Sequence, residues 1–267
     1  MRYVFDIETD GLLDNCTKIH CLVLKDIDSG TVHHFRPSQI REGLLLLEQA
    51  QVLIGHNIIK FDLPVIHKLY PNFNTQATLQ DTIICSRLIW TNLKERDFAH
   101  LNKHPDYPKK LIGKHSLEAW GYRLGVLKGE FHKETDWSQW SEAMQAYCEQ
   151  DVLVTERLWQ KIEAKGYAQQ AIELEHAFAQ IIFQQEQAGF AFDVKAATNL
   201  YGQLCERRQA LEGELKTYFP NWEIRTPFTP KVNNKKLGYQ KGVLTEKVKV
   251  IEFNPNSRDH IADRLIK

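Results

Sequence analysis

MRYVFDIETD, residues 1–10, joins a short run of β-forming apolar residues to two carboxylates. Tyr3 to Ile7 has the composition of a buried strand, and residues two apart in a strand point to the same face. Asp6 and Glu8 are therefore expected to project together. Because adjacent carboxylates repel unless a cation lies between them, the pair indicates a site for Mg²⁺ or Mn²⁺. A solvated strand end is the competing interpretation of an isolated DxE.

Strands and helices alternate in the first part of the chain. Three more strands are expected over residues 19–27, 31–35 and 52–54, the first two joined by a turn at Asp28-Ser29-Gly30. Helices are expected from Ser38 to about Ala50, after Asp62, after Thr82, from Ser116 to Gly125, and over Trp137–Glu163. This order predicts an α/β domain with a mixed sheet flanked by helices.

The C-terminal part has a different composition. We place the domain boundary near Lys165-Gly166, so that residues 1–166 form the α/β domain and residues 167–267 a helical extension. Helices are expected over 173–187 and 194–218. Residues 225–249 hold seven Lys or Arg against one acid and are predicted to be a basic, loosely structured arm. Residues 94–114 are predicted to be an irregular basic insertion because they carry Pro105 and Pro108.

The composition of the chain argues against a disordered protein and against a membrane-spanning one. Of the 267 residues, 43% are apolar and 25% are charged, which favours a packed core over disorder. The formal net charge is zero, so the overall balance gives no support to nucleic-acid binding. No apolar run is long enough to span a bilayer. Five cysteines without a CxxC pair are typical of reduced thiols in a cytoplasmic protein.

Two later motifs add carboxylates. His56-Asn57-Ile58-Ile59-Lys60-Phe61-Asp62 follows a predicted strand and opens a helix, where Asp62 could be only the helix N-cap. Tyr147 and Asp151 lie four apart within a predicted helix, so they share one face. Each motif alone is weak.

Together, in this order, the DxE, NxxxFD and YxxxD motifs resemble those of the DEDD exonuclease superfamily, in its tyrosine-bearing branch. The resemblance implies a ribonuclease H-like fold and hydrolysis of the terminal phosphodiester with two metal ions. It implies that Asp6, Glu8 and Asp151 hold one ion, that Asp6 bridges to the second, and that Asp62 reaches them through water. It implies that Tyr147 orients the attacking water. Candidate substrate contacts are Thr9, Leu12, His56 and Asn57.

Further segments resemble the proofreading domain of family A DNA polymerases, especially those of short-tailed bacteriophages. They are Asp81-Thr82, Ser86–Ile89 and His115–Gly125. Residues 173–193 and 253–260 resemble the start of a polymerase module, but the sequence contains no palm or fingers motifs. Nucleotide addition is therefore not expected. A stand-alone exonuclease and a fragment of a longer polymerase both remain open.

The resemblance implies a 3′→5′ exodeoxyribonuclease that prefers single-stranded or frayed DNA ends, with a separate polymerase chain as a possible partner in the host cytoplasm. An RNA exonuclease similar to ribonuclease D and a non-catalytic DNA-binding fragment of a polymerase are the alternatives. Side chains that could contact the phosphate backbone are Lys60, Lys94, Arg96, Lys103, Lys109, Lys110, Lys114 and the basic arm.

Overall fold

The computed structural model describes residues 1–101, 107–126 and 136–266. It forms two compact units, Met1–Gly189 and Phe190–Lys267. The first unit extends past the expected boundary at 166, because the helix α7 (Gln169–Ala188) belongs to it. Lys103 lies outside the described residues.

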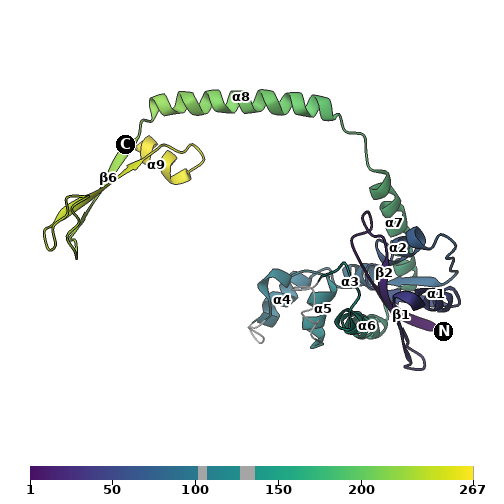
Figure 1. Cartoon of the computed structure of the whole chain (residues 1–267). Coiled ribbons are helices and arrows are strands. Elements are labelled where there is room, and N and C mark those ends of the chain that lie inside the picture. Colours follow the sequence, from purple (N-terminus) through teal and green to yellow (C-terminus); the bar gives the residue numbers. More distant parts are fainter. Residues whose placement is uncertain (102–106, 127–135, 267) are drawn as a thin grey trace. The chain divides into compact units, whose positions relative to one another are not determined.

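The first unit is built on the predicted mixed sheet (Figure 1). Its five strands lie in the order β3-β2-β1-β4-β5. The pairs β1–β2 and β2–β3 are antiparallel, whereas β1–β4 and β4–β5 are parallel. The strand bounds are Arg2–Thr9 (β1), Ile19–Asp26 (β2), Val32–Phe35 (β3), Val52–Gly55 (β4) and Thr78–Asp81 (β5).

The strand β5 was not expected from the sequence. Its four residues, TLQD, carry little apolar alternation, and only pairing with β4 makes them a strand. This parallel pairing places Asp81 beside Gly55, at the ends of both strands. The loop after β4 therefore starts next to Asp81.

The alternation along β1 sends its side chains to two separate cores. Tyr3, Phe5 and Ile7 pack in a cluster with residues of α1 (Ile40–Glu48) and α2 (Asp62–Leu69). Val4 packs in a second cluster with residues of α3 (Thr82–Ile89), α5 (Leu117–Leu124) and α6 (Glu142–Glu163). Asp6 has the same parity as Val4, so it faces the layer that contains α6.

Local capping explains where several of these helices begin and end. The Ser116 hydroxyl accepts from the Ala119 amide at the start of α5, and Gly125 ends that helix in the left-handed region with φ of 68°. Ser141 caps α6 in the same way, so α6 begins at Glu142 and not at Trp137 as predicted. The first helix, expected from Ser38, begins at Ile40 because residues 37–39 form a short 3-10 turn before α1.

The described residues of the segment 94–114 are more ordered than predicted. It contains the helix α4 (Leu93–Leu101) and a 3-10 turn at Lys109–Leu111. Asp97 of α4 is buried and receives hydrogen bonds from the Gly113 amide at 2.8 Å and from Arg123 at 2.7 and 2.9 Å. This buried ion pair ties α4 to α5, so the prediction of an irregular insertion is wrong for the first third of the segment.

The second unit combines helices with a hairpin. The helix α8 (Val194–Tyr218) is capped by Asp193, and none of its residues is buried. The strands β6 (Trp222–Phe228) and β7 (Thr245–Ile251) pair antiparallel, followed by α9 (Arg258–Ile266). The predicted loose arm, residues 225–249, is thus strand at its two ends, 225–228 and 245–249, and the residues between them form turns with one bridge between Asn234 and Tyr239. Arg264 of α9 lies 3.8 Å above the Trp222 ring and joins the hairpin to α9.

Among the described residues, none of the helices is both long and apolar enough to cross a membrane.

Candidate active site

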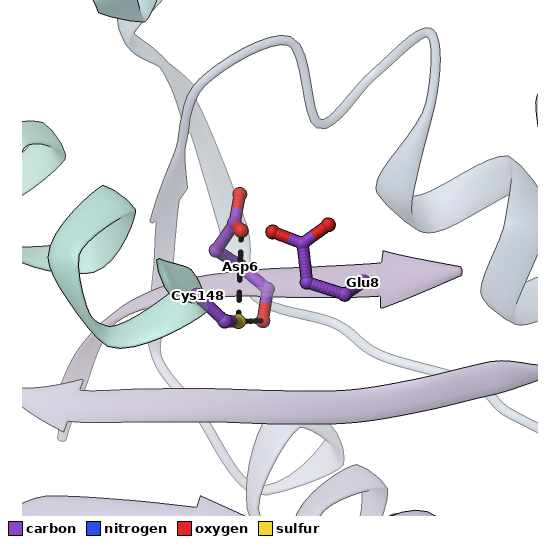
Figure 2. Close-up of side chains that lie close together, drawn as sticks. All are labelled: Asp6, Glu8 and Cys148. Carbon is purple, nitrogen blue, oxygen red and sulfur yellow. Dashed lines mark hydrogen bonds between the residues drawn. The ribbon is translucent and has the colours of Figure 1, made fainter. Parts of the chain in front are cut away.

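The two carboxylates of β1 lie next to α6. Figure 2 shows the side chains of Asp6 and Glu8 close together on β1, with Cys148 beside Asp6. The Cys148 thiol donates to the Asp6 carbonyl oxygen at 3.3 Å and lies 3.6 Å from Asp6 Oδ2. Single ligand atoms of the three residues all lie within 4.8 Å of one another. The predicted common orientation of Asp6 and Glu8 therefore holds in the fold.

All four predicted carboxylates line one cavity of about 540 Å³. Glu8, Asp62 and Asp151 are buried, and Asp6 is half-buried. Asp62 is the first residue of α2, whose N-cap position is occupied by Phe61, so its role is not that of the cap. The other predicted site residues that line this cavity are Tyr147, His56 and Asn57.

The electrostatics of the cavity favour a bound cation. Burial, with the nearby negative charges of Asp81 and Asp151, raises the pKa of Asp62 to about 7. Burial also raises the pKa of the Cys148 thiol well above its ordinary value, so this sulfur stays protonated and adds no charge. Oxygen ligands from several carboxylates fit a hard divalent ion. The residues present therefore fit a divalent metal ion such as Mg²⁺ or Mn²⁺.

Asp81 holds the loop that carries the second motif. Its carboxylate accepts from the Asn57 amide at 2.8 Å and from the Ile59 amide at 3.1 Å. Asn57 has φ of 72°, a left-handed conformation that asparagine tolerates better than most residues. The Asp81 amide in turn donates to Nε2 of His176 on α7 at 2.7 Å. The loop before Asp62 is thus held by hydrogen bonds to Asp81 at the end of β5, and Asp81 is in turn held by His176 of α7.

Sequence reasoning missed this supporting role of Asp81 and His176. Asp81-Thr82 was noted only as part of the family resemblance. His176 gives no local signal, because its partner lies 95 residues earlier. Thr82 also contributes, since its hydroxyl lies 2.8 Å from Nδ1 of His56.

Tyr147 lies on the side of α6 that faces the cavity. It is buried, and its ring meets Trp137 edge to face with centroids 6.4 Å apart. Asp151 follows one turn later on the same helix and lines the same cavity. The i, i+4 spacing therefore brings the phenol and the carboxylate together, as predicted.

Two predicted substrate contacts do not line the cavity. The Thr9 hydroxyl is buried and donates to the Gly11 carbonyl at 2.8 Å, so it stabilises the turn after β1. Leu12 is 76% exposed, which rules out ordinary core packing. Its backbone carbonyl accepts from the amides of Asn15 and Cys16. Leu12 therefore projects from a hydrogen-bonded turn beside the end of β1.

The family of the chain follows from a match to residues 3–163 by a model of the RNase H superfamily. The chain belongs to the RNase H superfamily. The match covers the five strands and all residues that line the acidic cavity, because it runs from β1 to the end of α6. The superfamily and the acidic cavity together support a nuclease.

Two curated relatives extend the similarity beyond this domain. They are the DNA-directed DNA polymerases of Enterobacteria phage T3 and Escherichia phage T7, each 31% identical over an alignment that is 345 residues long. Both alignments cover 98% of this chain and 49% of the relative. The chain therefore spans about half the length of these polymerases.

Solved structures show only a low similarity to the chain. A nuclease in its apo form is 22% identical, with a TM-score of 0.49, over 72% of this chain and 88% of that one. Escherichia coli RNase D is 17% identical, with a TM-score of 0.43, over 68% of this chain and 45% of that one. Similarity at this level carries no argument about substrate.

Proposed function

We propose that this protein is a 3′→5′ exodeoxyribonuclease that releases nucleoside 5′-monophosphates from single-stranded or frayed DNA ends. The observation that carries the proposal is the gathering of four carboxylates and Tyr147 in one cavity of a chain of the RNase H superfamily. The volume of that cavity falls in the range of about 300–1,000 Å³ that is usual for small-molecule sites. One terminal nucleotide is therefore a fitting occupant.

The carboxylates would hold two divalent cations, Mg²⁺ or Mn²⁺. Asp6, Glu8 and Asp151 would bind the first, Asp6 would also reach the second, and Asp62 would act through water. When bound, such ions supply an activated water near neutral pH and neutralise charge at the scissile phosphate. The raised pKa of Asp62 supports this assignment, because a cation would offset both the cost of burying its negative charge and the repulsion from Asp81 and Asp151.

The chain's own side chains would orient the reactants. The Tyr147 hydroxyl can donate a hydrogen bond to the attacking water, and the contact of its ring with Trp137 restricts its position. His56 and Asn57 line the cavity and would contact the terminal sugar or phosphate. Because Tyr147 lines the cavity beside Asp151, we propose that the protein belongs to the tyrosine-bearing branch of the DEDD exonucleases.

The relatives favour DNA over RNA. Both are DNA polymerases, and each alignment covers 98% of this chain, so it extends into the second unit. We therefore propose a role in DNA replication or proofreading in the cytoplasm of a phage-infected host. A separate polymerase chain is a candidate partner.

The test is degradation of a 5′-labelled single-stranded DNA oligonucleotide. Wild-type protein should give a descending ladder with Mg²⁺ or Mn²⁺, none with EDTA, and none after Asp6→Ala. Asp14→Ala is the matched control, because Asp14 is exposed and does not line the cavity. A matched RNA oligonucleotide distinguishes the ribonuclease alternative. If the folded protein degrades neither the DNA nor the RNA oligonucleotide, the proposal is overturned in favour of a non-catalytic binding module.

A further inference from the structure

A second cavity adjoins the acidic one within the first unit. It measures about 400 Å³, is lined mainly by residues of α3 and α7, and is called the α3–α7 groove here. Asn57, Ile83 and Arg87 line both cavities. A strand whose terminal nucleotide occupies the acidic cavity could therefore continue into the groove without leaving the protein surface.

The walls of the groove fit a base. They are largely apolar, and they include Ile84, Leu88 and Phe178. Phe178 is 54% exposed, although a phenylalanine is usually buried in a folded domain. Flat aromatic side chains at the surface are the common means of stacking single-stranded bases without sequence preference.

Arg87 supplies a positive charge where the two cavities meet. It lies in the last turn of α3, is exposed, and forms no salt bridge within the described part of the chain. Lys60 also lines the groove, but its ammonium group lies 2.6 Å from Glu186, and Glu175 adds a negative charge to the lining. Arg87 is therefore the cation best placed to bind a phosphate beside a cavity that otherwise repels one.

We propose that the α3–α7 groove binds the penultimate nucleotide of single-stranded DNA, with Arg87 at its phosphate and Phe178 against its base. This inference rests on the proposed function for the position of the strand end. Arg87 is a binding residue here and takes no part in the chemical step. The groove would explain a preference for unpaired ends, because a paired base cannot stack on Phe178.

The test is binding of a fluorescent single-stranded 12-nucleotide DNA to the full-length protein in EDTA, followed by anisotropy at several salt concentrations. Arg87→Gln should raise the Kd about tenfold and reduce the slope of log K against log salt by about 0.7, the value for one phosphate contact on a single strand. Arg41→Gln makes the same charge change at an exposed site on α1 and should have no effect.

A substrate change locates the contact. A neutral methylphosphonate at the linkage before the scissile one should weaken wild-type binding about tenfold and should not weaken the Arg87→Gln variant further, because the two changes remove one interaction. Phe178→Ala should raise the Kd about tenfold. Phe98→Ala, a control with a similar exposure of 52% on α4, should leave it unchanged.

Additive losses in the methylphosphonate cycle, or equal effects of Arg87→Gln and Arg41→Gln, would overturn the proposal. If Arg87→Gln and Phe178→Ala both leave the affinity for DNA unchanged, the DNA does not reach the groove because protein covers it. That result would also overturn the proposal. These outcomes do not depend on hydrolysis, so a chain that binds DNA but degrades none would contradict the proposed function alone. Circular dichroism checks that the variants fold.

Discussion

Asp62→Asn should stabilise the metal-free protein at pH 8 while it abolishes hydrolysis. Burial is the main reason that the pKa of this carboxyl rises from 3.8 to about 7. A rise of about three units corresponds to about 4 kcal/mol at about 1.4 kcal/mol per unit. Asparagine removes the buried charge and keeps an oxygen acceptor, so the gain in the free energy of unfolding should lie between about 1 and 4 kcal/mol.

The pH dependence fixes the sign of this effect. Below pH 3.8 the carboxyl is protonated in both the folded and unfolded states, so it adds no pH dependence. Between pH 3.8 and about 7 the unfolded chain ionises first, and stability falls as pH rises. The stability gained by Asp62→Asn over the wild type should therefore increase between pH 3.8 and about 7 and remain constant at higher pH.

Thermal unfolding in EDTA measures the difference, at about 2–4 °C per kcal/mol for a domain of this size. Asp14→Asn, at an exposed position, is the control. Added Mg²⁺ should stabilise the wild type and reduce its gap to the variant, because the ion binds only the folded site. A variant that melts below the wild type at pH 8, or a gap that does not change with pH, would refute the reasoning.

Three other predictions test the site and the core. Tyr147→Phe should preserve the melting temperature and Mg²⁺ binding but lower kcat about 10²-fold, because it removes only the hydroxyl that orients water. Single-turnover kinetics measures the rate of hydrolysis. A fully active variant would exclude this role for the hydroxyl. Asp97→Ala should cost about 3–5 kcal/mol in urea unfolding, since it leaves the Arg123 guanidinium buried without its carboxylate; a loss below about 1 kcal/mol would contradict the ion pair's importance. Burial lowers the pKa of His115 from 6.5 to about 4, so stability should fall as pH falls through this range. His115→Gln should reduce the dependence of the melting temperature on pH over this range. An unchanged dependence would assign the loss of stability to other groups.

The sequence predicted the parts of the fold and site that depend on local periodicity. Alternation along a strand is enough to place Asp6 and Glu8 together, and the helical repeat is enough to place Tyr147 above Asp151. The turn at 28–30 likewise predicted the β2–β3 hairpin, which the structure confirms. Charge and proline content misled us where pairing with distant residues creates order, as in α4 and in the hairpin β6–β7.

Tertiary contacts decided the rest. The loop before Asp62 depends on Asp81, 22 residues beyond Ile59, and Asp81 depends on His176, a further 95 residues along the chain. The approach of Cys148 to Asp6 spans 142 residues. Arg87 lies in the segment Ser86–Ile89 that contributes to the family resemblance, but only the groove between α7 and α3 suggests a binding role for it. The periodicity of a strand or helix determines which residues share one face of that element. The packing of the elements determines which faces meet.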